Sequence, residues 1–335
     1  MSSEIAETGN LIQIISQSRQ NALKKVNEEL IHMYWKVGEY LSMESVKASF
    51  GDAYIDSVVE EIQEAFPGIR GFNRRGLYRM KKFYETYRND KFVSTLLSQI
   101  SWSNHLAIMS KAKTEEERHF YITLCVKENY SARELSRQID SGYYERYMLS
   151  KEKLLPEPIK GLKENPFLDS YVIEFLDLPS NFKEVDLRKG LIKNMKDFIL
   201  EVGKDFTFID EEYRVQVGGE DYKIDLLFFH RGLQCLVAFE LKIGKFKPEY
   251  ISKMDFYLEA LDRQKKKENE NPSVGMILCA SKDDEVVEYA MSRTLSPMMV
   301  AEYQLQLPDK NVLQRKLQEL INMPLLESGE TPSLQ

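Results

Sequence analysis

Apolar residues recur three and four residues apart through the first part of the chain, which is the spacing of one face of an α-helix. Windows with this spacing predict helices over residues 11–41, 53–66, 73–84, 114–128 and 131–139. Pro67 and Gly68 end the second helix, and Ser131 with Glu134 forms a capping box at the start of the last. We therefore expect residues 1–148 to form an all-helical domain.

The pattern changes between residues 149 and 183. Four prolines fall in this stretch, so neither a long helix nor a central strand fits it. We expect a linker or extended bridge here, with one short helix near residues 169–176.

From residue 184 onward, helical periodicity alternates with short apolar runs. Helices are predicted over 184–202, 248–267, 284–292 and 311–321, and strands over 207–216, 222–229, 233–241, 274–280 and 298–303. The order αβββαβαβα predicts a mixed sheet with helices on both faces. The whole chain is thus expected to be α+β, with a helical domain followed by an α/β domain over 184–335.

Three charged residues interrupt the most apolar part of this second domain. Residues 221–242 read DYKIDLLFFHRGLQCLVAFELK, two strand-like runs around a predicted tight turn at Arg231 and Gly232, with His230 as an exposed turn residue. Asp225, Glu240 and Lys242 lie within these runs. An unpaired buried charge costs several kcal/mol, so each needs a partner.

The predicted turn also fixes which residues face each other. With position 230 opposite 233, Asp225 lies opposite Ala238, and Glu240 and Lys242 project from the same face of the sheet. Carboxylates at a diagonal spacing of about 7–8 Å repel each other unless a cation lies between them. The arrangement therefore predicts a cation site next to a lysine.

Oxygen ligands with open positions suit Mg²⁺ or Mn²⁺. A neighbouring lysine can orient or activate a water and offset charge that develops on phosphorus. This is the outline of a phosphodiester hydrolysis site. The alternative is a surface strand pair in which Glu240 forms an ordinary salt bridge; we favour the catalytic interpretation because Asp225 adds a second acid on the same face.

Composition narrows the class of protein. The 335 residues are 43% hydrophobic and 30% charged, with a net charge of -7, which excludes a uniformly basic, histone-like nucleic-acid binder. No stretch approaches 18 uninterrupted apolar residues and the first ten residues lack the features of a signal peptide, so we expect a cytoplasmic protein with no membrane partner. Three scattered cysteines and four histidines give no support for disulfides or a zinc cluster.

Basic residues are nevertheless concentrated in one segment. Residues 66–91 contain eight basic residues and only two acidic ones. Asn73 is placed to cap a helix whose exposed positions are basic, and the preceding helix and glycine-containing turn suggest a helix-turn-helix. The candidate DNA contacts are Arg70, Arg74, Arg75, Arg79, Lys81 and Lys82. An ordinary solvated face on a structural helix explains the composition equally well.

Longer motifs carry a resemblance to a known family. The segment GGEDYKIDLLFFHRGLQCLVAFELKIGKFKPEYISKMDFYLEALD resembles the YhcG-type family of PD-(D/E)XK nucleases, and FNRRGLYRMKKFYETY, QISWSNH and SARELSRQI resemble its N-terminal helical domain. The resemblance implies a restriction-endonuclease-like fold, with Asp225 and Glu240 holding the metal and Lys242 serving the attacking water. Glu201 would be an auxiliary acid on the preceding helix.

Several further residues are expected near such a site. Lys253 and Tyr257 occupy the helix face where many relatives carry a glutamine, and Gln216 is a polar support at best. Lys245 and Lys247 follow the motif strand and are candidates for contact with the DNA backbone, although an ordinary basic loop explains them equally well.

The sequence thus predicts a Mg²⁺- or Mn²⁺-dependent DNA endonuclease that acts in defence against foreign DNA or on recombination and branched intermediates. Nuclease folds of this kind often act as dimers, so a homodimer is an expectation of the resemblance. RNA as substrate stays open. The rival hypothesis is a DNA-binding or assembly subunit whose nuclease fold no longer cuts.

Overall fold

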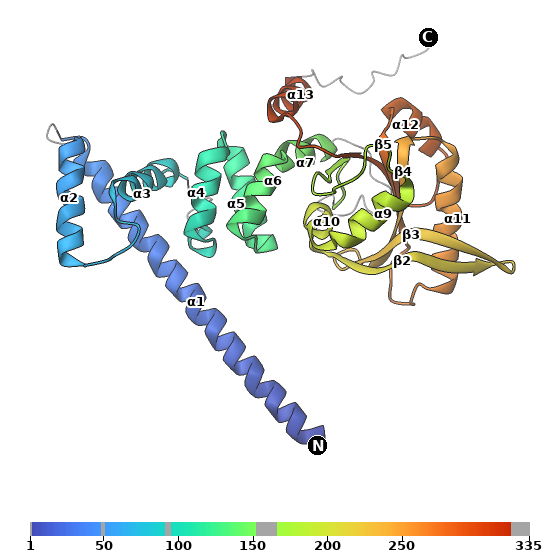
Figure 1. Ribbon diagram of the computed structural model, residues 1–335, viewed down its shortest axis with the longest axis horizontal. Helices are drawn as coiled ribbons and strands as arrows, with labels where there is room; N and C mark the ends of the chain where they lie inside the picture. Colours follow the sequence, from blue (N-terminus) through green and yellow to red (C-terminus); the bar gives the residue numbers. More distant parts are fainter. Residues whose placement is uncertain (1, 48–50, 91–94, 152–165, 323–335) are drawn as a thin grey trace, which may run out of the picture. The chain divides into compact units, whose positions relative to one another are not determined.

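The computed structural model describes residues 2–47, 51–90, 95–151 and 166–322 (Figure 1). The chain divides into two compact units, residues 1–139 and 140–335. This division precedes the boundary predicted at residue 148. Arg146 and Ser150 account for the difference, because they bond to Glu201 and to the backbone N–H of Asp169 in the second unit.

The first unit is helical throughout its described residues, as predicted. Its elements are α1 (Ser2–Glu44), α2 (Asp52–Ala65), α3 (Arg74–Tyr87), the 3₁₀ turn η2 (Leu97–Gln99), α4 (Trp102–Lys111), α5 (Glu115–Glu128) and α6 (Ala132–Asp140). The capping box of α6 is confirmed, since the Ser131 N–H donates to Glu134 at 2.8 Å and the Glu134 N–H donates to the Ser131 hydroxyl at 3.3 Å.

Helix α3 packs one face into the core of this unit and leaves the opposite face basic. Its Asn73 cap is confirmed, because the Asn73 side chain accepts the Gly76 N–H at 2.8 Å. Leu77, Met80 and Phe83 are buried on the inner face. The connection from α2 covers residues 66–73, which is longer than the three- or four-residue turn of a standard helix-turn-helix.

Helices α1 and α3 approach each other closely at Gly38. A Cβ atom at this position would lie 2.1 Å from the carbonyl oxygen of Met80 and 3.0 Å from the Cβ of Tyr84. Trp35 packs edge-on against Phe83 next to this crossing. The crossing therefore depends on the absence of a side chain at residue 38.

The second unit is built on a six-stranded mixed sheet in the order β1-β6-β5-β4-β3-β2. The strands are β1 (Ser170–Val172), β2 (Phe206–Val217), β3 (Glu220–His230), β4 (Cys235–Lys245), β5 (Val274–Ser281) and β6 (Met298–Gln304). Pairs β2/β3 and β3/β4 are antiparallel, and β4/β5, β5/β6 and β1/β6 are parallel. The predicted mixed sheet is confirmed.

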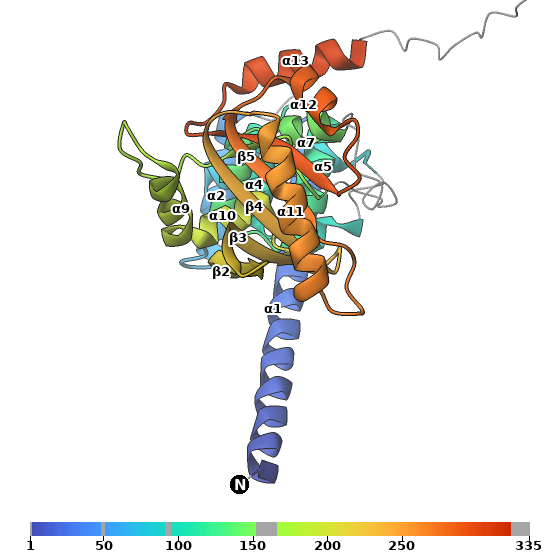
Figure 2. The same cartoon turned by 90° about the vertical axis from the view of Figure 1, so that its right-hand side faces the viewer.

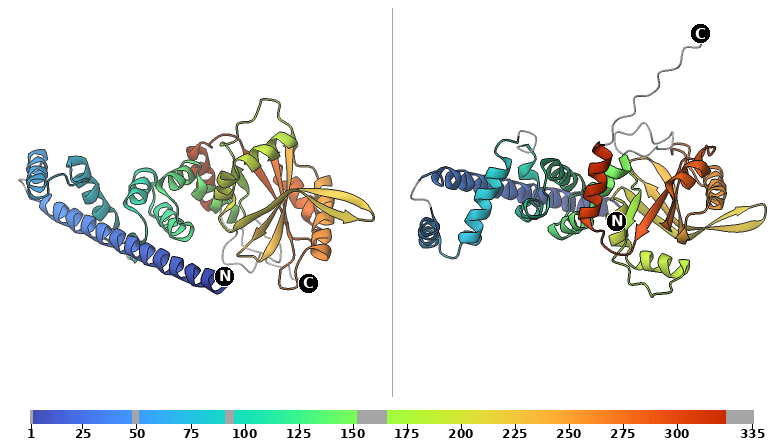
Figure 3. Two further views of the ribbon diagram at one scale, coloured as in Figure 1. Left: turned by 60° about the horizontal axis from the view of Figure 1, so that its bottom comes forward. Right: turned by 90° about the horizontal axis from the view of Figure 1, so that it is seen from above.

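Helices cover both faces of the sheet (Figures 2 and 3). The unit contains α7 (Tyr143–Lys151), α9 (Glu184–Lys193), α10 (Met195–Val202), α11 (Glu249–Gln264), α12 (Asp284–Met291) and α13 (Lys310–Asn322). Leu187, Leu191 and Phe198 of α9 and α10 pack on one face, while Met254 and Leu258 of α11 pack on the other. The sheet is thus buried on both sides, which explains its nearly continuous apolar runs.

The β3–β4 register differs from the predicted one by two residues. His230 pairs with Cys235, so the turn contains four residues, 231–234, and Gln234 adopts a left-handed φ of 51°. Continuing the last pair, Leu226 with Phe239, brings Asp225 level with Glu240 and not with Ala238. A shift of two is one full pleat, so Glu240 and Lys242 keep their common face.

Three local predictions were wrong. Residues 170–172 form the parallel edge strand β1 and not a helix, because Ser170–Val172 pairs with Glu302–Gln304 of β6. The helix predicted over 184–202 breaks at Asn194 into α9 and α10. His230 is buried and not exposed: its Nδ1 accepts the Leu233 N–H at 3.0 Å, and its ring packs edge-on against Phe206.

Across the described residues, every helix is too short or too polar to cross a membrane, α1 included.

Gly38→Ala should lower the free energy of unfolding by about 1–3 kcal/mol, because the added methyl group overpacks the crossing of α1 and α3. Gly51→Ala is the matched control, since nothing lies within 4 Å of a Cβ there. Urea unfolding monitored by circular dichroism measures both. Equal stability of the two variants would contradict the close approach.

Candidate active site

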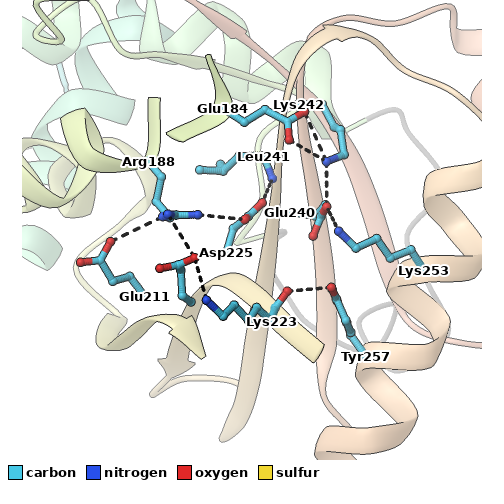
Figure 4. Close-up of polar contacts among 11 residues, drawn as sticks. Glu184, Arg188, Glu211, Lys223, Asp225, Glu240, Leu241, Lys242, Lys253 and Tyr257 are labelled. Atoms are coloured by element: carbon cyan, nitrogen blue, oxygen red, sulfur yellow. Dashed lines mark hydrogen bonds and ion pairs between the residues drawn. The ribbon is translucent and has the colours of Figure 1, made fainter. Parts of the chain in front are cut away.

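The candidate site begins where β3 and β4 separate. Their paired residues end at Leu226 and Phe239, and the next backbone donor, the Leu241 N–H, is accepted at 2.8 Å by the carboxylate of Asp225 (Figure 4). Ile224 packs on the α11 side of the sheet although Leu226 packs on the other side, so the period-two alternation breaks at Asp225. The break holds the Asp225 carboxylate against the β4 backbone.

Glu240 lies on β4 beside this break and is almost completely buried, with a relative exposure of 1%. Lys242 Nζ lies 2.8 Å from Glu240 Oε1, and the ammonium group of Lys253 on α11 pairs with the same oxygen. The second oxygen, Oε2, is buried and has no hydrogen-bond partner among the described residues. A buried carboxylate oxygen without a partner is costly unless a cation or water binds it.

Two residues of α9 complete the site, and the sequence analysis missed both. Glu184, in the first turn of α9, lies 3.3 Å from Lys242 Nζ. Arg188, one turn later, approaches Asp225 Oδ1 at 3.6 Å and Glu212 at 3.4 Å. Their i,i+4 spacing places them on one helix face and was visible in the sequence. Nothing in the sequence showed that this face meets the separation of β3 and β4.

The site is a compact set of opposed charges. Burial, and secondly the charge of Glu240, raises the pKa of the Asp225 carboxyl. Burial would lower the pKa of Lys242, but its hydrogen bond and charge contact with Glu240 outweigh this and raise it. The same balance raises the pKa of Lys253. Contact with the Glu240 carboxylate therefore favours the protonated form of both ammonium groups.

Glu201, the predicted auxiliary acid, makes its described contacts on α10 with a different set of partners. It is fully buried, Arg146 Nη1 lies 2.6 Å from its Oε1, and it accepts the Val172 N–H at 2.7 Å. These contacts join α7, α10 and β1. Its catalytic role stays a prediction, and its contacts identify a structural one.

The other predicted residues lie at varied places around the sheet. The Tyr257 hydroxyl donates to the Lys223 carbonyl at 2.7 Å and so ties α11 to β3 below the site. Gln216 is exposed near the end of β2. Its backbone carbonyl accepts a hydrogen bond from the Gln264 side chain at 2.8 Å. Lys245 and Lys247 are exposed beyond Lys242 and form long ion pairs with acids, at 3.8 and 3.7 Å.

The predicted DNA contacts line part of a cavity in the helical unit. The cavity has a volume of about 440 Å³, and basic side chains from α3 and α4 line it: Arg75, Arg79, Lys82 and Lys111. Arg70 and Arg74, which precede these residues in the sequence, are exposed, and Arg74 lies 3.5 Å from Asp56. Lys81 is half-buried and pairs with Glu85 at 3.7 Å. Lys111, missed from sequence, adds to the patch.

A second group of acidic and histidine side chains lies in the helical unit. Asp90, Glu115 and His119 present ligand atoms within 4.8 Å of one another. His119 already pairs with the Asp90 carboxylate, and Glu115 is exposed. This group is separate from Asp225 and Glu240, and ion pairing accounts for it.

The residues of the β3–β4 site fit a divalent cation. Asp225 and Glu240 supply hard oxygen donors, and the orphaned Oε2 of Glu240 gives a specific position that a cation would satisfy. Lysine and arginine now neutralise the same carboxylates. Positive charge is therefore required at this point of the fold, and Lys242 remains beside it to contact a water or a phosphate.

Comparisons with known proteins agree with this architecture. Residues 164–318 match the family described as YhcG PDDEXK nuclease domain, and residues 10–146 match the DUF1016 N-terminal domain. "Putative nuclease YhcG" of Escherichia coli (strain K12) is 27% identical over 359 residues, covering 95% of this chain and 94% of that protein.

Solved structures show more distant similarity. A repair endonuclease from Pyrococcus abyssi is 16% identical over 39% of this chain and 50% of its own, with a TM-score of 0.26. EndoMS in an EndoMS–dsDNA2 complex is 15% identical over 40% of this chain and 48% of its own, also with a TM-score of 0.26.

Asp225→Asn should stabilise the metal-free protein near neutral pH. A raised carboxyl pKa means that ionisation of Asp225 costs folding free energy, and this cost appears as the pH rises through the folded-state pKa. The gain should be largest near pH 7 and should shrink toward pH 4. Thermal unfolding in EDTA at both pH values measures it, and a gain that grows toward pH 4 would contradict the charge argument.

Proposed function

Because this chain belongs to the YhcG-type family of PDDEXK nucleases, we propose that it is a divalent-metal-dependent DNA endonuclease. The observation that carries the proposal is the convergence of Asp225, Glu240 and Lys242 at the separation of β3 and β4. Carboxylates beside a lysine are the donor set of metal-assisted phosphodiester hydrolysis. Mg²⁺ and Mn²⁺ both suit these oxygen ligands.

We assign the residues distinct roles. Asp225 and Glu240 hold the cation, with Glu184 as an additional acid reached from α9. A bound cation would act as a Lewis acid toward the scissile phosphate and lower the pKa of a bound water. Lys242 orients the attacking water and offsets charge on the phosphate, and the half-exposed Lys253 supports Glu240 from α11.

The helical unit is proposed to bind the DNA substrate. Phosphate contacts require local positive charge, and the α3 patch provides it on a chain whose net charge is -7. A helix-turn-helix mode of binding remains a proposal from the basic helix and the glycine-containing turn before it. Action on foreign or branched DNA remains a proposal from the family resemblance.

Cleavage of a panel of linear, supercoiled, single-stranded and branched DNA, together with RNA, in Mg²⁺ and in Mn²⁺ tests the activity. We expect wild type to cut DNA, and Asp225→Ala and Lys242→Ala to lose at least about 100-fold in rate. Both variants should still bind DNA in Ca²⁺. If wild type binds DNA but cleaves nothing in either metal, the result would favour a catalytically silent assembly subunit. If it cleaves RNA in preference to DNA, RNA would be the substrate.

Glu184→Gln and Glu201→Gln should separate an active-site acid from a structural one. Glu184 is 45% exposed, so its replacement should leave stability nearly unchanged while cleavage falls about tenfold or more. Glu201→Gln leaves the buried Arg146 charge without its counter-ion and should cost about 3 kcal/mol of unfolding free energy. Urea unfolding, with cleavage measured where both variants are folded, distinguishes them; the reverse pattern would restore Glu201 as the auxiliary acid.

Replacing Arg74, Arg75 and Arg79 together with alanine should weaken DNA binding and lower the salt dependence. The slope of log K against log [salt] should fall by about 2–3, roughly 0.9 for each phosphate that the protein no longer neutralises. Replacing the acids Glu60, Glu61 and Glu64 of α2 with alanine is the control on a neighbouring helix. An unchanged slope in the arginine variant would remove the α3 patch from the interface.

A further inference from the structure

Helix α1 carries an apolar stripe along nearly its whole described length. At 100° per residue, one side of the helix presents Leu11, Ile12, Ile15, Ala22, Leu23, Val26, Leu30, Met33, Val37 and Leu41. Arg19 and Glu29 are the charged residues on this side between residues 11 and 41. Such a continuous stripe is typical of a helix that packs along its full length.

The helical unit covers only the C-terminal part of this stripe. Met33, Val37 and Leu41 pack into the core that α1 shares with α2 and α3. Toward the N-terminus the same side is open, with Leu11 57%, Leu23 69% and Val26 57% exposed. The open residues 11–26 therefore continue, along the same helix (Figure 1), a face that is buried farther along, and from Asn27 onward the helix contacts the unit through the Ser98 and Ile100 carbonyls.

The exposed segment is large enough to form an interface. Leu11, Ile12, Ile15, Leu23, Val26 and Leu30 each have about 60–120 Å² of apolar area to bury. Two such faces together bury about 1,000 Å², and their flanks, which include the 63%-exposed Ile14, bring the total toward the 1,200–2,000 Å² of stable protein interfaces. Isolated soluble chains rarely leave a patch of this kind open.

We propose that α1 pairs with α1 of a second copy of this chain, in antiparallel orientation. A parallel pairing in register would place Arg19 on Arg19 and Glu29 on Glu29. These like-charge contacts oppose the parallel arrangement.

The antiparallel arrangement avoids these contacts. It places Leu11 opposite Leu30, Ile15 opposite Val26, and Arg19 opposite the small Ala22, where its long side chain can reach solvent. Apolar layers thus match at both ends of the open segment, while Ile12 lies opposite Glu29 and Leu23 opposite Ser18. This dimer is independent of the proposed nuclease chemistry, because none of its residues belongs to the β3–β4 site.

Light scattering coupled to size exclusion tests the interface on the full chain. Wild type at micromolar concentration should have twice the mass of one chain, and Leu23→Glu/Val26→Glu should be monomeric with an unchanged circular dichroism spectrum. Gln13→Glu/Gln20→Glu adds the same charge on exposed positions outside the stripe and should remain dimeric. A monomeric wild type, or a dimeric Leu23→Glu/Val26→Glu variant, would overturn the proposal.

Disulfide trapping tests the orientation. Cys125, Cys235 and Cys279 are buried, so single engineered cysteines can be followed. Mixed Leu11→Cys and Leu30→Cys chains should form a cross-linked heterodimer under mild oxidation, and each variant alone should not. Efficient cross-linking of Leu11→Cys with itself would overturn the antiparallel pairing. A further variant carries Leu11→Cys together with a second engineered cysteine on the surface of residues 166–322. If this variant forms only intramolecular cross-links, the second unit of the same chain covers α1, and the proposed dimer is overturned.

Discussion

The burial of the Glu240 carboxylate constrains the second unit more than any other single interaction. A carboxylate in the middle of a sheet covered on both faces is costly unless positive charge compensates it. Lys242 from the same strand and Lys253 from α11 both reach one of its oxygens. Strand β4, helix α11 and the site are therefore coupled through one ion, and the second oxygen is left for a cation.

The neighbouring acids extend the same electrostatic requirement to the other face. Asp225 stands where β3 separates from β4, so its carboxylate takes the Leu241 N–H that a regular ladder would pair with a carbonyl. Arg188 and Glu184 come from α9, which packs on the side of the sheet opposite α11. The site thus lies where both helical layers meet an opening between two strands. At this opening the Asp225 side chain takes the place of a strand partner for the β4 backbone.

The two units solve different physical problems. The second unit concentrates opposed charges around the buried Glu240, whereas the first exposes basic side chains on α3 and an apolar face on α1. Exposed positive charge suits phosphate, and an exposed apolar stripe suits another apolar helix. The Arg146–Glu201 pair is a buried charge pair of another kind, since it joins α7 to α10 and β1 within the second unit and serves the fold.

Much of this architecture follows from the sequence alone. Helical and strand periodicity determined the helical first unit and the mixed sheet, because the apolar spacing of each element specifies its core side. The common face of Glu240 and Lys242 was also predictable, since the pleat alternates with period two whatever the turn. An error of two residues in the β3–β4 register left that face unchanged.

Only the tertiary structure decided which distant residues meet at the site. Glu184 and Arg188 join Asp225 and Glu240 because of where α9 crosses the strands along their length, and the periodicity of a helix does not specify that position. Glu201 matched the expected helix acid by its place in the chain, but the break at Asn194 turned its helix toward Arg146. Local spacing thus fixes which face a side chain occupies, while the packing of whole elements fixes its partners.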